Sequence, residues 1–306
     1  MSSTIANDAP SFKVEASDWD RASESYAQLA SKGSPMSVPI TKLVEMLHTF
    51  LPFDFATTIL DIGCGPGNAT AQLISTHHTA IPASTQLLAT DFSSGMLNLA
   101  SELRTANLGV MQGTEKDTWA RVVPLVLDAT DLRPLLSDSV SHIIANFVLF
   151  MIENPAKALR EAHRVLKSGG VAACSSWSNK MDWIECFELA ASRTFPAIGK
   201  PLPQRPTFAA QWTSVEGVGA LLTDAGFRDI HTEYVEAPIV VHSLEGFAHH
   251  FLTSGNPAVT WATDVLDEIE VEQLKKQLAQ VIKEKSKVEN GAYILGGTAV
   301  LAIGRK

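Results

Sequence analysis

The sequence predicts an α/β fold with a mainly parallel sheet. Short apolar runs at residues 57–62, 86–91 and 122–127 have the pattern of buried strands, and helical patterns separate them. The first run ends in a glycine loop that leads into a helix from Asn68, and the second ends in a carboxylate, Asp91. Such units place backbone N–H groups and strand ends at one edge of a sheet, where small ligands bind.

The remaining elements continue this alternation. Helices are predicted at residues 38–51, 68–77, 94 onward, 154–167, 214–225, 243–253 and 264–287, and further strands at 139–147, 171–177, 227–237 and 292–304. Ser93 is suited to cap the helix after the second strand. The apolar face of the helix at 264–287 is Val265, Ile269, Leu274, Leu278, Val281 and Ile282. Gly296 and Gly297 indicate a bulge within the last strand.

Composition excludes several classes of function. The chain has 306 residues, 45% of them hydrophobic, and a net charge of −9 without a basic stripe, so no nucleic-acid partner is expected. No apolar run is long enough to cross a bilayer, and the polar N-terminus lacks a secretory signal, so a cytoplasmic protein without membrane association is predicted. Cys64, Cys174 and Cys186 lack metal-ligand spacing, so reduced thiols and no metal are expected.

The glycine loop favours a ligand with a cationic amino group. A dinucleotide fingerprint would require glycine at the position of Asn68, whereas the loop runs Gly63, Gly65, Gly67. Asp61 lies two residues before the loop and would repel a pyrophosphate. The sequence therefore argues against a nicotinamide-dependent dehydrogenase.

Three segments resemble the class I S-adenosylmethionine-dependent methyltransferases. Residues 59–70, Ile-Leu-Asp-Ile-Gly-Cys-Gly-Pro-Gly-Asn-Ala-Thr, resemble motif I of that family, and residues 90–97 resemble motif II. Residues 158–170 resemble the helix and turn that follow these motifs in the small-molecule branch. The resemblance implies a seven-stranded Rossmann-like sheet in the order 3-2-1-4-5-7-6, with strand seven antiparallel and helical lid segments.

The same resemblance implies S-adenosylmethionine as cofactor, with S-adenosylhomocysteine as its product. Asp91 follows Gly63 by 28 residues, where a carboxylate accepts both hydroxyls of a ribose. Phe92 and Met96 would flank the adenine, and Asp128 would accept from its amino group. The predicted cofactor-binding residues are Asp61, Gly63, Cys64, Gly65, Gly67, Asn68, Asp91, Phe92, Met96, Asp128, Ala129, Asn146 and Phe147.

Aromatic residues outside the motifs are predicted to bind the substrate or to close over it. They are Trp19, Tyr26, Trp177, Trp183, Phe208 and Trp212. The chain is expected to form a disordered tail at 1–11 and a single domain at 12–306. Within the domain we expect an N-terminal lid at 12–37, a cofactor-binding core at 38–177, substrate-cap segments at 178–212 and 243–290, and the rest of the core at 213–242 and 291–306.

The predicted activity is methyl transfer to a small molecule, by in-line displacement aided by proximity and desolvation. Residues 91–97 and 169–183 resemble fungal secondary-metabolite methyltransferases, including those that methylate thiols of the gliotoxin type. The resemblance implies that the acceptor is a thiol, or a carboxylate or hydroxyl oxygen. No catalytic residue is assigned, and His249 and His250 are weak candidates for a general base.

Two alternatives remain open. One is a protein that binds the cofactor without methyl transfer, as a regulator or a cofactor-assisted pericyclase. The other is methylation of RNA or protein, which the acidic charge and the lack of an amine-gripping motif after the fourth strand disfavour. The oligomeric state is not predicted.

Overall fold

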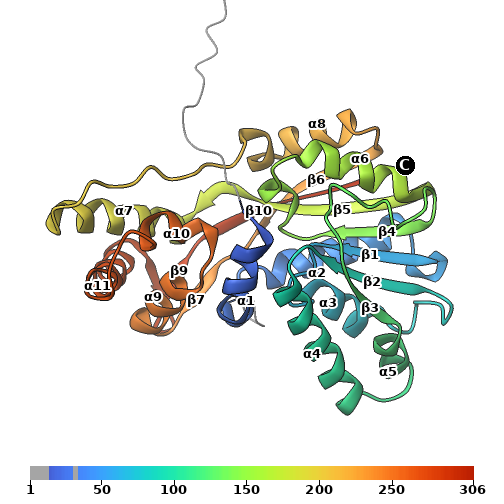
Figure 1. Cartoon of the computed structure of the whole chain (residues 1–306), viewed down its shortest axis with the longest axis horizontal. Coiled ribbons are helices and arrows are strands. Elements are labelled where there is room, and N and C mark those ends of the chain that lie inside the picture. The colour runs from blue at the N-terminus through green and yellow to red at the C-terminus, as the bar shows by residue number, and fades with distance from the viewer. Residues whose placement is uncertain (1–13, 30–33) are drawn as a thin grey trace, which may run out of the picture.

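The computed structural model describes residues 14–29 and 34–306, and the tail predicted at 1–11 lies outside these ranges. A seven-stranded sheet runs through the larger part of the molecule (Figure 1), in the order β3-β2-β1-β4-β5-β10-β6. Its strands are β1 Thr58–Ile62, β2 Gln86–Asp91, β3 Val122–Val126, β4 Val140–Ala145, β5 Leu166–Met181, β6 Arg228–Glu236 and β10 Gly297–Arg305. With β10 as seventh strand, the predicted order is confirmed.

The pairing of the strands sets the position of the site. β1 pairs in parallel with β2 and with β4, whereas β10 is antiparallel to both β5 and β6. The strand order changes direction between β1 and β4, so the carboxyl ends of β1, β2 and β4 meet at one edge. In open α/β sheets this switch point is where ligands bind.

Helices cover both faces of this sheet. Figure 1 shows α6 (Pro155–Val165) and α8 (Val215–Asp224) on one side, with α2 (Ser37–Phe50), α3 (Asn68–His77) and α4 (Ser94–Val110) on the other. α1 (Ala16–Leu29) packs on α4. Ser93 caps α4 as predicted, since its hydroxyl accepts from the Met96 N–H at 3.1 Å. The short helix α5 (Gly113–Ala120) was not predicted, because it has no apolar stripe.

Beyond Met181 the chain builds a second cluster of elements around its own apolar core. It comprises α7 (Asp182–Ala197), α9 (Leu244–Thr253), α10 (Pro257–Thr263), α11 (Glu268–Lys285) and a small antiparallel sheet in the order β7-β9-β8. The strands of that sheet are β7 Ile239–Val241, β8 Lys287–Glu289 and β9 Ala292–Leu295. Phe187, Phe195 and Phe251 are buried in this second core. These elements lie to one side of the main sheet (Figure 1).

Two predicted elements have different bounds in the structure. The helix expected at 264–287 begins later, at Glu268, because Asp267 and Glu270 form a capping box at the start of α11. Val265 lies before the helix and is 51% exposed, and Ile269 in its first turn is 73% exposed, while Leu274 and the later members of the predicted face are buried.

The strand expected at 292–304 breaks at Gly296, whose N–H donates to the Asp182 carboxylate at 2.7 Å. β9 joins the small sheet and β10 the main one. The predicted bulge is present as a register shift between Gly297 and Ala299. β5 extends past the predicted 171–177 at both ends, and its carboxyl end is held by pairing of Met181 with Gly297.

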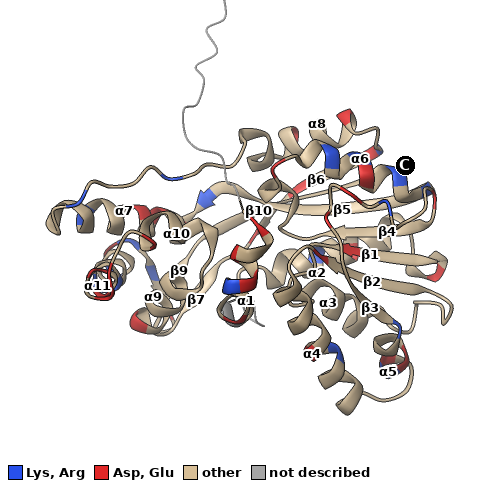
Figure 2. Ribbon diagram, viewed as in Figure 1, with Lys and Arg blue, Asp and Glu red and all other residues tan. Residues whose placement is uncertain are grey.

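Charged residues are distributed over many elements. Figure 2 shows Lys and Arg on separate helices and loops, mixed with Asp and Glu. Within residues 14–29 and 34–306, the helices are all too short or too polar to cross a bilayer.

Candidate cofactor and acceptor site

The glycine loop after β1 depends on backbone conformations that only glycine adopts easily. Gly63, Gly65 and Gly67 have φ values of 60°, 53° and 94°. A Cβ on Gly63 would also lie 2.4 Å from the Cγ2 atom of Val148. Gly67 has the left-handed conformation at the N-cap of α3. The loop therefore turns sharply enough to bring its backbone to the switch point.

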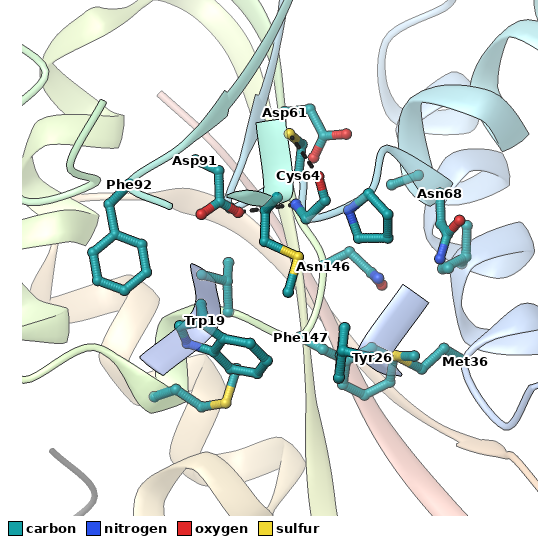
Figure 3. Close-up of a pocket in the computed structure, with 18 residues that line it drawn as sticks. Trp19, Tyr26, Met36, Asp61, Cys64, Asn68, Asp91, Phe92, Asn146 and Phe147 are labelled. Atoms are coloured by element: carbon teal, nitrogen blue, oxygen red, sulfur yellow. Dashed lines mark hydrogen bonds between the residues drawn. The ribbon is translucent and has the colours of Figure 1, made fainter. Parts of the chain in front are cut away.

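A cavity of about 660 Å³ lies at this switch point (Figure 3). The predicted cofactor residues that line it are Asp61, Gly63, Cys64, Gly65, Asn68, Asp91, Phe92, Met96, Asn146 and Phe147. Gly67 does not line it, and a Cβ on this residue would lie 3.4 Å from the Cδ2 atom of Leu103 in α4. Asp128 and Ala129 line a neighbouring cavity of about 950 Å³, which shares Gly63 and Phe92 with the first. Strand and loop patterns, together with the resemblance to a family, thus predicted most of these walls.

Asp61 has an unsatisfied carboxylate oxygen inside the protein. Its side chain is buried, Oδ2 accepts from the Thr70 hydroxyl at 2.6 Å, and Oδ1 has no partner among the described residues. The pKa of Asp61 is raised to about 7, mainly by burial and in smaller part by the nearby charge of Asp91, while the Thr70 hydrogen bonds oppose the shift. A buried carboxylate without a partner is costly, so this position fits a cationic amino group.

Asp91 holds the glycine loop and also faces the cavity. Its Oδ2 accepts from the Gly65 N–H and its Oδ1 from the Ser93 N–H, both at 2.9 Å. Burial raises its pKa, and these hydrogen bonds from the backbone counteract that effect. Each carboxylate oxygen can accept a second hydrogen bond. The side chain can therefore bind a diol while it keeps the loop in place.

A serine of β5 holds the two residues that follow β4 in place by hydrogen bonds. The Ser175 hydroxyl donates to Oδ1 of Asn146 at 2.9 Å, and its oxygen accepts from the Phe147 N–H at the same distance. Phe147 has a φ of 52° and stacks on Trp177, with ring centroids 4.3 Å apart. Ser175 was not predicted, because nothing in the sequence distinguishes it from the other small residues of β5.

α1 forms the wall opposite the two carboxylates. Trp19 and Tyr26 lie across the cavity from Asp61 and Asp91 (Figure 3), and their rings meet edge to face at 5.0 Å. Tyr26 is partly buried, and desolvation of its hydroxyl, with the nearby charge of Asp91, raises its pKa to about 12.

Asp20 attaches α1 to the beginning of α4. Its Oδ1 accepts from the Ser93 hydroxyl and from the Gly95 N–H, both at 2.7 Å. A Cβ on Gly95 would lie 3.0 Å from the Cα atom of Asp20, so the glycine permits this close approach. The carboxylate accepts from a helix N-terminus, where negative charge is favourable. Sequence analysis missed Asp20, whose only signal is its place beside Trp19.

A second cavity, of about 580 Å³, opens beside the first. The two share Trp19, Tyr26, Phe147 and Met151. Of the residues predicted to contact substrate, Trp177, Trp183 and Phe208 complete its aromatic walls. Trp177 and Trp183 meet edge to face at 5.1 Å. Gly297 makes room for this arrangement, since a Cβ there would lie 2.2 Å from the Trp183 ring.

Three predicted site residues lie elsewhere. Trp212 is 2% exposed in the main core, and its carbonyl accepts from the Ser176 hydroxyl at 2.6 Å. His249 and His250 are exposed on α9 and line neither cavity. The structure therefore gives no support to the prediction that they supply a base, because neither side chain lines the walls that an acceptor would contact.

The cysteines lack the properties of a nucleophile or a metal site. All three are buried, and burial raises the pKa of Cys174 to about 12 and that of Cys186 to about 11. Burial also raises the pKa of Cys64 well above its ordinary value. Among the described residues, no group of His, Cys, Asp and Glu side chains has the arrangement of a metal site.

Known proteins share this architecture and part of its sequence. Residues 60–174 match a family model described as a methyltransferase domain. The methyltransferase ucsB of Acremonium sp. is 32% identical, over 75% of this chain and 76% of the relative. The methyltransferase tpcH of Aspergillus fumigatus is 25% identical, over 81% of this chain and 84% of the relative. The solved structure of the [4+2]-cyclase SpnF has the same fold, with a TM-score of 0.55 at 15% identity and with 97% of this chain and 99% of that chain covered.

Proposed function

Because the chain belongs to the class I S-adenosylmethionine-dependent methyltransferases, we propose that it methylates a thiol or an oxygen of a small, largely apolar secondary metabolite. The observation that carries this proposal is the pairing of the two cavities. The first contains the unpartnered Asp61 oxygen and the Asp91 carboxylate, and the second is walled by aromatic rings. A charged, hydrogen-bonding ligand and an apolar one would therefore meet at the residues that both cavities share.

The residues of the chain would hold and orient both ligands. When bound, S-adenosylmethionine supplies a methyl group on a sulfonium, which needs no further activation. Asp61 is suited to its amino group, Asp91 to its ribose, and Phe92 with Met96 to its adenine. Alignment of two reactants can contribute about 7–11 kcal/mol to lowering the barrier. Trp19 and Tyr26 would exclude water from the junction of the cavities.

The absence of a histidine from the described walls of both cavities supports an acceptor that ionises readily. A thiol, with an ordinary pKa of about 8.5, or a carboxylate needs little help from a base. The test is release of S-adenosylhomocysteine with a panel of aromatic thiols, phenols and carboxylates. We expect acceptor-dependent release by the wild-type protein and its loss in Asp91→Ala. Release that Asp91→Ala leaves unchanged would contradict the proposal.

A second candidate function is cofactor binding without methyl transfer. The fold supports it, since SpnF is described as a [4+2]-cyclase. This candidate predicts conversion of an unsaturated substrate while the bound cofactor remains intact. Mass spectrometry of the cofactor before and after turnover separates the two functions.

We also propose that α1 acts as a lid over bound cofactor, because Asp20 fastens it beside Asp91. Asp20→Ala removes two hydrogen bonds to a charged group and should speed dissociation of S-adenosylhomocysteine about tenfold. Stopped-flow tryptophan fluorescence measures the rate, and Glu24→Ala, an exposed change on the same helix, is the control. Equal dissociation rates in Asp20→Ala and the wild type would disprove the lid.

A further inference from the structure

One charged side chain lines the second cavity, in which the acceptor is proposed to bind. Among the described residues around this cavity, Arg205 is the only one with a formal charge. It follows α7 in the loop that leads toward Phe208, and its side chain is 28% exposed. Partial burial lowers its pKa, but a guanidinium remains charged at any physiological pH. A lone cation among tryptophan and phenylalanine rings is an unusual feature in a cavity built for apolar surface.

The partner of Arg205 does not belong to the cavity. Arg205 pairs through Nη1 with the Glu188 carboxylate of α7. Glu188 is 39% exposed at its side chain and does not line the cavity. The guanidinium carries five N–H donors in a planar fork, so an acid inside the cavity can share it with Glu188 or replace that partner.

We propose that Arg205 determines acceptor specificity by binding an acidic group, a carboxylate or a phenolate, of a flat apolar acceptor. This inference rests on the proposed methyl transfer and narrows its substrate class. Arg205 lines only the second cavity and not the first, in which the cofactor is expected. The anchored acid is therefore separate from the group that is methylated. The acceptor has two functional groups, an acid at Arg205 and a thiol or hydroxyl toward the shared residues Phe147 and Met151.

The charges and shapes of the walls agree with this assignment. Trp177 and Trp183 line the cavity with aromatic rings, which suit a flat ring system. An acid buried among such rings would be disfavoured without a cation, so Arg205 selects acids over their neutral esters. A guanidinium binds a carboxylate through two parallel hydrogen bonds, and a phenolate through fewer.

Calorimetric titration of the protein saturated with S-adenosylhomocysteine tests the inference. The probes are 6-hydroxy-2-naphthoate, its neutral methyl ester and 2-naphthol. We expect wild-type protein to bind the acid at least about tenfold more tightly than the ester. Arg205→Met should weaken binding of the acid by about ten- to a hundredfold and leave the ester unchanged, while Arg205→Lys retains part of the preference. Glu188→Gln should strengthen binding of the acid, because a competing acceptor is lost.

Arg193→Met is the matched control, because Arg193 of α7 pairs with Glu284 of α11 at 2.9 Å on the surface and lines neither cavity. It should leave both affinities unchanged. Equal binding of acid and ester by wild type, equal loss of both in Arg205→Met, or no binding of the acid would overturn the inference. Titration with S-adenosylhomocysteine alone separates the proposals. Failure there refutes the methyltransferase function, whereas normal cofactor binding without a charge preference refutes only the role of Arg205.

Discussion

Replacement of Asp91 by alanine should weaken binding of S-adenosylhomocysteine by about a hundredfold, to which two lost hydrogen bonds to a charged group contribute about 3 kcal/mol. The carboxylate is expected to accept from the ribose hydroxyls. It already accepts from the N–H groups of Gly65 and Ser93. Alanine would therefore remove a ligand contact and also release the glycine loop from the end of β2. Isothermal titration calorimetry measures the affinity.

Two further variants separate these effects. Asp91→Asn keeps an oxygen for the Gly65 N–H but loses the charge, so we expect an intermediate affinity. Asp131→Ala removes a carboxylate whose partner is the exposed Arg133, and it should leave the affinity unchanged. Wild-type affinity in Asp91→Ala would mean that the ribose binds elsewhere. The position of Asp91 at the end of β2 would then have no role in recognition.

Affinity for S-adenosylhomocysteine should fall about tenfold for each pH unit below about 7, because of Asp61. In the free protein Asp61 takes up a proton below that pH, since burial disfavours its charge. A bound ammonium group favours the carboxylate, so binding must release this proton. Above about pH 7 the carboxylate is already ionised and the affinity should level off. Titrations across this range in two buffers of different ionisation enthalpy measure both the affinity and the released proton.

Asp61→Asn is the control for this pH dependence. It should bind weakly, with a flat pH profile between about pH 5 and about pH 8 apart from any contribution of Asp91, whose pKa is also raised. If the affinity of Asp61→Asn depended on pH as steeply as that of the wild type, a group other than Asp61 would be responsible.

The same shift has an opposite consequence for stability of the free protein. The pKa of Asp61 is raised in the folded state from 3.8 to about 7. The contribution of protonated Asp61 to stability is fully present below the unfolded-state pKa of 3.8, and it is lost as the pH rises through the folded-state pKa of about 7. Thermal unfolding should therefore show Asp61→Asn gaining stability relative to the wild type as the pH rises from about 4 to about 7, with no further gain above that range. Addition of S-adenosylhomocysteine should restore the stability of the wild-type protein, because the ammonium group of the ligand stabilises the charge of Asp61.

Sequence patterns predicted the parts of the site that lie along one strand and its following loop. Asp61, Gly63 and Asp91 belong to segments whose conformation depends on neighbouring residues: a buried strand, a turn that needs positive φ, and a helix cap. Their positions in the structure agree with the prediction. The strand order agreed as well, but it came from resemblance to a family, because local residue patterns do not specify which strands pair.

Predictions that depended on distant contacts were less successful. Trp212 has the size and polarity of a pocket residue, but its place in the core is decided by packing against strands far away in sequence. The strand at 292–304 is locally continuous, and only the contact between Gly296 and Asp182 divides it between two sheets. Neither Ser175 nor Arg205 carries a motif, so their roles follow from the cavities that they face.

From the sequence alone came the parallel α/β core, the glycine loop and the two carboxylates beside it, because spacing and residue type act over short stretches of chain. The tertiary structure alone decided which aromatic rings surround the second cavity, that Asp20 attaches α1 to α4, and that one arginine lies in a largely apolar wall. These features join segments that are widely separated along the chain, and their geometry depends on how the second core packs beside the sheet.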